Sequence, residues 1–441
     1  MHSSLPKVLQ PLAGRPMLGH VVDRARSLGA AGLHIVYGHG GDAVKAAFPD
    51  PDLSWHEQAE QLGTGHAVAQ ALPAIPDDHD VLVLCGDVPL ISQDALAALA
   101  QGVGDGALAL LTAELEDPTG YGRIIRGLDG GVTEIVEHAD ASDDQLKISE
   151  INTGLMAAPA GRLRDWISRL DCGNAQGEFY LTDVVALAVA DDTDVIGVTV
   201  SNAEQALGIN DKLQLAAAER MLQRQLAETL MRSGVTVIDP ARIDIRGDLQ
   251  TGADVVIDVG AIFVGRVSLG DGCRIGPNVI IRDAELGPGT IVHANSVIVE
   301  SKVGAGCDIG PFARLRPGNV LADGVKIGNF VEAKNSEIGS GSKVNHLSYV
   351  GDATIGTRVN VGAGTITCNY DGANKHRTTI GDDVFVGSGV NLVAPITIAD
   401  GATIGAGSTL TKNAPEQELT IARTRQTSIS GWKRPVKKTK E

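Results

Sequence analysis

Aliphatic residues recur at every sixth position over long stretches of the second half of the chain. The series consists of Leu269, Ile275, Ile281, Leu286, Val292, Ile298, Val303, Ile309, Leu315, Leu321, Ile327, Ile338, Val344, Ile355, Val361, Ile380, Val386, Leu392, Ile398, Ile404 and Leu410. Neither a helix nor an alternating strand produces this spacing. A six-residue repeat is typical of a β-helix, in which three hexads form one triangular coil of about 18 residues. We therefore expect a prism with these side chains inside; glycine-rich strands of a β-sandwich are the alternative.

The rhythm breaks after Ile327 and again between Thr367 and Ile380. The segment 368–377, with the sequence CNYDGANKHR, does not fit the repeat, so we expect it to leave the prism as a loop. Polar residues that interrupt the repeat are the candidates for function: Arg316, Lys334, His346, Tyr349 and Asn360. A histidine can take a proton from an attacking amine, although by residue type alone a surface side chain is an equal explanation.

Residues 1–210 show a different pattern, in which helix-like and strand-like segments alternate. The expected helices are 17–28 and 65–72, and the expected strands are 32–37 and a buried strand at 81–85. This alternation predicts an α/β domain with a mainly parallel sheet, whose ligands bind beyond the carboxyl ends of the strands. Asp87 follows the second of these strands, so it is placed either to hold a metal ion or to cap the turn before Val88.

Residues 211–232, between the two patterns, have apolar positions at approximate helical spacing. Asn210 and Asp211 can cap the start of this helix, and Gly234 can end it. We expect a helix that links two domains, with a short oligomerisation coiled coil as the alternative.

The net charge limits the kinds of partner that we expect, and the cysteines indicate the cellular location. The net charge of −17 argues against nucleic-acid or membrane partners, but it leaves room for small phosphate-bearing ligands held by local lysines and arginines. The five cysteines are scattered and form no CxxC pair, which favours reduced thiols and a cytoplasmic location. No run of 18 apolar residues occurs that would span a membrane.

Several motifs together carry a resemblance to a known family. They are LPKVL at 5–9, QLGTGHA at 61–67, GDVPLI at 86–91, DPTGYGRI at 117–124, EINTG at 150–154 and NAQGEFYLTD at 174–183. In these motifs, and through the β-helix to the tail, the chain resembles the family of bifunctional N-acetylglucosamine-1-phosphate uridyltransferases / glucosamine-1-phosphate acetyltransferases (GlmU). The resemblance implies an α/β Rossmann-like nucleotidyltransferase domain at 1–210, a linker helix at 211–234, a left-handed parallel β-helix acetyltransferase domain at 235–412 and a basic tail at 413–441.

The resemblance also implies which residues of the first domain bind ligands. Asp87 and Asn210 would hold Mg²⁺. The residues expected to bind UTP and the UDP-sugar are Lys7, Gln58, Gly63, Thr64, Gly86, Gly122, Glu137, Asn152 and Asn210. In-line attack of a sugar-1-phosphate oxygen on the α-phosphorus of UTP needs positive charge near the phosphates rather than a nucleophilic side chain.

In the second domain the resemblance implies a general base and two binding sets. His346 would be the base, and Arg316, Lys334, Tyr349 and Asn360 would bind the amino-sugar phosphate. The residues expected to contact acetyl-CoA are Ala363, Asn369, Tyr370, Ser388, Ala406 and Arg423. Because the amine attacks bound acetyl-CoA directly, this step needs neither a metal nor an acyl-enzyme; Cys368 as a nucleophile is the alternative.

The implied function is the synthesis of UDP-N-acetylglucosamine for peptidoglycan and lipopolysaccharide, by a homotrimer assembled through the β-helix. The sequence departs from the family pattern at one point that affects this function. In the family, a strand and a glycine-rich loop, LAAGxGTRM, precede the LPKVL motif. Here that motif begins at Leu5. Either the natural chain starts about twenty residues earlier, or the enzyme is an acetyltransferase only. We expect little uridyltransferase activity from the chain as printed.

Three other functions fit parts of the sequence. A sugar nucleotidyltransferase whose β-helix only joins subunits would not need the set around His346. A metal enzyme on the same prism would need clustered histidines, and the β-helix has only His293, His346 and His376. A purely structural scaffold would bind no substrate.

Overall fold

The computed structural model describes residues 1, 3–38, 40–435 and 437. The chain forms two compact units, Met1–Leu222 and Gln223–Glu441, and the division falls inside α7 (Lys212–Arg232). The carboxylate of Asp211 accepts the backbone N–H of Gln214 at 2.8 Å at the start of this helix, and Gly234 has a φ of 100° just after its end. Within the described residues, no helix is long and apolar enough to cross a membrane.

The largest sheet of the first unit is mixed. Its strands are β10 (Val195–Thr199), β6 (Leu108–Glu114), β9 (Glu150–Pro159), β7 (Arg123–Arg126), β8 (Val132–Val136) and β5 (Asp80–Val83). Only β10 and β6 pair in parallel, whereas β9 runs antiparallel to β5, β6 and β7. The expectation of a mainly parallel sheet is therefore wrong here, because the long strand β9 returns between strands of the opposite direction and β7–β8 is a hairpin.

A second, separate sheet consists of the parallel strands β3 (Leu33–Tyr37) and β4 (Leu53–Glu57). The other helices of this unit are α1 (Met17–Ser27), α2 (Gly41–Ala47), α3 (Thr64–Ala71), α4 (Gln93–Gln101), α5 (Ala160–Ser168) and α6 (Val184–Ala190). Residues 81–83 of β5 are only half-buried, in contrast to the expected buried strand, and every residue of β3 is half-buried as well. By comparison, six of the seven residues of β6 are buried.

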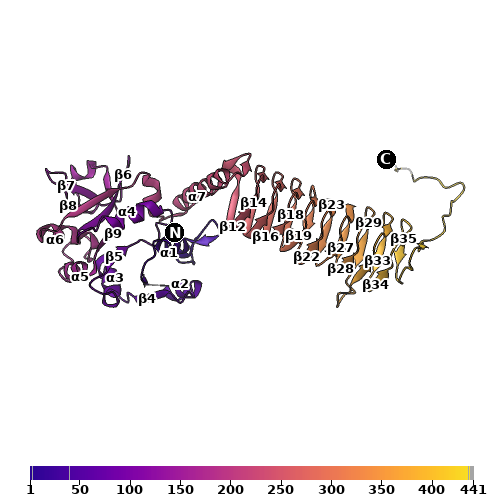
Figure 1. The fold of residues 1–441 in the computed structure, drawn as a ribbon, viewed down its shortest axis with the longest axis horizontal. Helices are drawn as coiled ribbons and strands as arrows, with labels where there is room; N and C mark the ends of the chain where they lie inside the picture. The colour runs from indigo at the N-terminus through magenta and orange to yellow at the C-terminus, as the bar shows by residue number, and fades with distance from the viewer. Residues whose placement is uncertain (2, 39, 436, 438–441) are drawn as a thin grey trace. The chain divides into compact units, whose positions relative to one another are not determined.

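The second unit is a parallel β-helix, whose short strands stack from β12 (Asp244–Thr251) to β36 (Thr409–Leu410) and run from pink to yellow in Figure 1. Paired residues on most successive coils lie 17 or 18 positions apart, as in Arg274↔Ile291 and Asp308↔Lys326. Each aliphatic residue of the six-residue series is at most 5% exposed. The repeat thus places one apolar side chain inside at each strand, and the polar neighbours face outwards.

The segment that breaks the rhythm leaves the prism between β30 (Ile366–Cys368) and β31 (Thr378–Ile380). Ala353 pairs with Thr378, so this coil holds 25 residues. The carboxylate of Asp371 accepts the backbone N–H groups of Ala373 and Asn374 and pairs with His376, which closes the loop on itself. The structure confirms the loop predicted for this insert.

Candidate functional site

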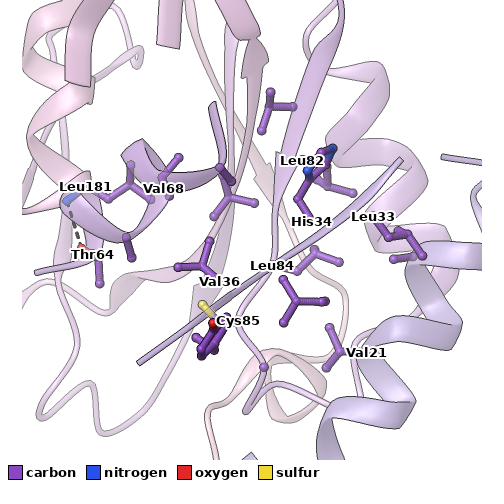
Figure 2. Close-up of a pocket in the computed structure, with 18 of the residues that line it drawn as sticks. Val21, Leu33, His34, Val36, Thr64, Val68, Leu82, Leu84, Cys85 and Leu181 are labelled. Atoms are coloured by element: carbon purple, nitrogen blue, oxygen red, sulfur yellow. Dashed lines mark hydrogen bonds between the residues drawn. The ribbon is translucent and has the colours of Figure 1, made fainter. Parts of the chain in front are cut away.

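The first candidate site lies at a cavity of about 920 Å³ in the first unit. Its walls include the apolar side chains of β3, β5, α1 and α3, and Figure 2 shows Val36, Leu82 and Leu84 around it. Six of the residues predicted to bind the nucleotide or sugar line this cavity: Lys7, Gln58, Thr64, Gly86, Glu137 and Asn152.

Lys7 lines the cavity and contacts both of the predicted metal ligands. Its Nζ lies 2.5 Å from Oδ2 of Asp87 and 2.5 Å from Oδ1 of Asn210. Two oxygen atoms from residues far apart in sequence therefore converge on one cationic group. Carboxylate and amide oxygens are ligands that suit Mg²⁺, so this pair fits a magnesium ion, with Lys7 available for phosphate.

The loop before α3 is shaped by Gly63. This residue has a φ of 109°, and a Cβ atom added to it would lie 2.6 Å from the carbonyl oxygen of Phe179. Only glycine fits such a position without a shift of the backbone. Gln58 donates from its amide to the carbonyl of Gly63 at 2.9 Å, and the hydroxyl of Thr64 accepts the N–H of Leu181 at 3.0 Å. The three predicted residues therefore form one ordered wall.

The predicted sugar-binding residues also lie together. The N–H of Asn152 donates to the carbonyl of Gly122 at 2.9 Å. A Cβ atom on Gly122 would lie 3.4 Å from a carboxylate oxygen of Glu137, so these two residues are neighbours. Burial raises the pKa of Glu137, while the hydroxyl of Thr182 donates to its carboxylate at 3.1 Å. Thr182 lies in the motif NAQGEFYLTD, but sequence reasoning assigned it no role, because its contact with Glu137 spans 45 positions.

The second candidate site is a column of residues on successive coils of the β-helix. His346 ends β26 (Lys343–His346), and Asn329 of β23 (Lys326–Asn329) is its register partner on the preceding coil. The following coils place Ala363, Ser388 and Ala406 in the same column, since Gly364, Gly389 and Gly407 donate to the carbonyls of His346, Ala363 and Ser388, respectively. Arg423 extends the column, because its guanidinium donates to the carbonyl of Ala406 at 2.7 Å.

The corner beside this column changes character at His346. Up to that coil the corner residues are the exposed side chains of Phe312, Phe330 and Leu347, and the two phenylalanine rings stack with centroids 5.3 Å apart. After it the corner residues are glycines, with φ values of 72°, 69° and 69° at Gly364, Gly389 and Gly407. A corner without side chains lets a ligand approach the backbone closely. The four residues of the column that follow His346 all belong to the predicted acetyl-CoA set.

A cluster of cationic side chains lies on the strands that follow this corner. Arg316 follows β21 (Arg314–Leu315) and pairs with Glu332 at 2.9 Å. Lys334 ends β24 (Glu332–Lys334), and the ammonium of Lys375 beside it lowers the pKa of Lys334. Two neighbouring ammonium groups that repel each other are suited to bind a doubly charged anion such as a phosphate. Sequence reasoning gave Lys375 no role, and its position in the ejected loop CNYDGANKHR was the only available signal.

Asp352 fixes the base of the ejected loop. Its carboxylate accepts the side-chain amides of Asn335 at 2.6 Å and Asn369 at 2.5 Å. Burial alone would raise the pKa of Asp352, but these hydrogen bonds and the charges of Lys375 and Lys334 hold it below its usual range. Sequence reasoning did not single out Asp352, because its contacts with Asn335 and Asn369 join different coils.

The remaining predicted residues fall near one or the other group. Tyr349 begins β27 (Tyr349–Gly351), with its hydroxyl 3.5 Å from the amide of Asn369, and the exposed Tyr370 donates to the carbonyl of Gly372 at 2.6 Å. Asn360, on β29 (Asn360–Val361), pairs with Lys343 in the sheet that carries His346. Across the described ranges, no hydrogen bond or ion pair joins the column of His346 to the cationic cluster. His346 lies in the sheet of β23 and β26, whereas Lys334 lies on β24 in the other sheet of the prism, so one copy of the chain presents the two groups on different faces.

Family models match segments of each half of the chain, and whole relatives match nearly its full length. The model of the MobA-like NTP transferase domain matches residues 1–136, that of the bacterial transferase hexapeptide (six repeats) matches 377–412, and that of the hexapeptide repeat of succinyl-transferase matches 266–300. The chain is 58% identical to the bifunctional protein GlmU of Alkalilimnicola ehrlichii over 435 residues, which cover 99% of the chain and 94% of that relative. It is 57% identical to the same protein of an Azoarcus species, with coverages of 99% and 97%. The relative from Aromatoleum aromaticum is 56% identical, with coverages of 99% and 96%.

Proposed function

Because the chain belongs to the family of bifunctional GlmU proteins, we propose that it makes UDP-N-acetylglucosamine in two steps, each in one of its two units. It is an acetyltransferase and a nucleotidyltransferase, and acetyl-CoA and UTP are its co-substrates. The relatives favour this bifunctional reading over an acetyltransferase alone. The first step would acetylate glucosamine-1-phosphate, and the second would transfer a uridylyl group to N-acetylglucosamine-1-phosphate. Such a product serves cell-wall synthesis, and we place the enzyme in the cytoplasm, as its free thiols suggest.

In the acetyl-transfer step, His346 would act as the general base. The amine nitrogen of glucosamine-1-phosphate attacks the thioester carbonyl carbon, a C–N bond forms, the C–S bond breaks, and coenzyme A leaves as the thiol. The proton released by the amine passes to the imidazole of His346, which then gives a proton to the departing sulfur. Arg316, Lys334 and Lys375 would hold the sugar phosphate. The glycine corner next to Ala363 would let the coenzyme lie along the coil edge.

In the uridylyl-transfer step, the chain would mainly position and neutralise phosphates. A phosphate oxygen of the sugar attacks the α-phosphorus of UTP and forms a P–O bond, while the bond from the α-phosphorus to the oxygen that bridges to the β-phosphorus breaks and pyrophosphate leaves. Lys7 would bind phosphate oxygens, and the wall around Gly63 would orient the nucleotide base. A magnesium ion held by Asp87 and Asn210 would supply positive charge beside the phosphates.

The observation that carries this proposal is that the predicted nucleotide and sugar residues lie at or beside one cavity of the first unit, while the predicted acetyltransferase residues lie in the column and the cationic cluster of the second unit. The test is an assay of the whole chain with glucosamine-1-phosphate, acetyl-CoA, UTP and magnesium. We expect coenzyme A thiol to appear first, and labelled UTP then measures how much UDP-N-acetylglucosamine the chain as printed makes. If no thiol is released from acetyl-CoA in the presence of the amino sugar, the acetyltransferase assignment is wrong.

The metal assignment predicts a selective effect of Asp87→Asn. This change keeps an oxygen ligand but removes its charge, so the magnesium concentration for half-maximal uridylyl transfer should rise about tenfold. Acetyl transfer by the same variant should stay at the parental rate. Asp78→Asn, at an exposed position, serves as the matched control. An unchanged magnesium requirement in Asp87→Asn contradicts the proposed ligand.

We also propose that the enzyme is a homotrimer assembled through the β-helix. Two observations support it: the exposed apolar ladder of Phe312, Phe330 and Leu347, and the separation of the two acetyltransferase groups on different faces of one copy. A neighbouring copy that covers the ladder would bring a second face to His346.

This assembly predicts that Phe330→Asp separates the copies. Aspartate tolerates the φ of 57° found at this position, so the coil itself should still form. Light scattering after gel filtration should then give the mass of three chains for the parent and a smaller mass for the variant. Leu128→Asp removes a fully exposed apolar side chain of the first unit and should change nothing. A parental mass for Phe330→Asp refutes this interface.

A further inference from the structure

His346 makes one side-chain contact that the function proposed above does not use. Its Nδ1 lies 2.8 Å from Oδ1 of Asn329. The two residues are register partners on neighbouring coils, at the ends of β23 and β26. The contact is therefore built into the stacking of the coils and does not depend on the loop 369–377.

The backbone around this contact is the same on both coils. Phe330 and Leu347, which follow the two residues, have φ values of 57° and 50°, and the N–H of Leu347 donates to the carbonyl of Asn329 at 3.1 Å. Two corners of equal shape stack directly, so their preceding side chains project side by side. Asn329 is half-buried, whereas His346 is exposed. The amide is thus the more fixed partner, and the imidazole is open to a substrate.

The chemistry of the contact determines which imidazole nitrogen is the base. An amide oxygen can only accept a hydrogen bond, so Nδ1 of His346 must carry a proton to satisfy it. In a neutral imidazole the lone pair is then on Nε2. We propose that Asn329 is a positioning residue for acetyl transfer, which holds His346 in the tautomer that presents Nε2 to the substrate amine. This inference rests on the proposed role of His346 as the general base.

Two variants separate positioning from mere packing. Asn329→Leu removes the acceptor at similar size, and we expect kcat to fall about tenfold to a hundredfold, the range for partners that orient a histidine, with little change in KM. Asn329→Asp keeps an acceptor, so it should retain most of kcat. Its carboxylate favours the protonated imidazole and should move the acidic limb of the rate profile to higher pH by about one unit. The charged side chains on the two strands are Lys326 and Lys343, at the ends opposite to this contact.

A direct reading of the tautomer completes the test. In protein labelled with ¹⁵N-histidine, the signals lost in His346→Gln identify the ring, and we expect a proton on Nδ1 in the parent and in Asn329→Asp but not in Asn329→Leu. Asn345→Ala, on the same strand as His346, is the matched control for an asparagine outside the contact.

The proposal is overturned if Asn329→Leu keeps the parental kcat, or if it loses activity while the ring stays protonated on Nδ1. If Asn329→Leu does not fold, the test rests on Asn329→Asp, and an unshifted pH profile in that variant overturns the proposal. The tautomer measurement does not depend on turnover, so failure of the proposed acetyltransferase function would be recognised separately.

Discussion

Replacing His346 by alanine lowers the rate of acetyl transfer by about two to four orders of magnitude, the usual contribution of a general base. The amine of the substrate must lose a proton as it attacks the thioester, and His346 is the only imidazole in the column of Asn329, His346, Ala363, Ser388 and Ala406. Because His346 is exposed, its truncation leaves no cavity in the prism. The measurement is the release of coenzyme A thiol at saturating substrates, together with the melting temperature.

His293→Ala is the matched control for this prediction. His293 lies on the same β-helix, is 44% exposed and pairs with Asp308 at 2.7 Å, but it belongs to neither proposed group. We expect its variant to acetylate at the parental rate, and both variants to melt within a few degrees of the parent. A parental rate for His346→Ala would remove the general base from the mechanism.

The sequence was sufficient to predict the β-helix because each coil contacts only its neighbours. One buried aliphatic side chain every six residues fixes the strand, the corner and the stacking at once, and no distant segment competes with that pattern. The ejected loop followed for the same reason, since ten residues without an inward aliphatic cannot fill a coil. The mixed sheet of the first unit was not predictable in this way. Whether β9 runs parallel or antiparallel to its neighbours depends on which strands it pairs with. The apolar sequences of strands such as β5 and β6 do not show in which direction a partner strand runs.

The same difference between local and long-range contacts decides which residues of the candidate sites could be predicted. The residues named from motifs lie together, because each motif marks the end of a strand or a corner. In the β-helix, the residues that sequence reasoning missed act through contacts between coils or across the loop. Asn329 and His346 are 17 positions apart, as are Asp352 and Asn369. A single sequence gives the spacing of such pairs but not the identity of the atoms that meet.

Removing Lys334 and Lys375 together is the second large effect that we expect. Each ammonium would make a charge-assisted hydrogen bond to the sugar phosphate, worth about 1.5–3 kcal/mol, or about tenfold to a hundredfold in kcat/KM. The double variant Lys334→Ala/Lys375→Ala should therefore lose about two to four orders of magnitude in kcat/KM for glucosamine-1-phosphate. The double variant Lys326→Ala/Lys343→Ala, which removes two exposed lysines from other strands of the prism, is the control and should stay near the parent.

The effects of the two lysine substitutions on kcat/KM should also be non-additive, and the structure determines the direction of the deviation. Lys375 lowers the pKa of Lys334, so each ammonium destabilises the other until a phosphate arrives. Phosphate binding relieves this repulsion in the parent, and each single variant loses that relief together with one contact, so it should lose more than half of the logarithmic loss of the double variant. Since phosphate needs the charged form, kcat/KM of the parent should fall as the pH rises through the lowered pKa of Lys334, and in Lys375→Ala this alkaline limb should move to higher pH. Additive losses together with an unshifted alkaline limb would show that the two ammonium groups do not share one phosphate.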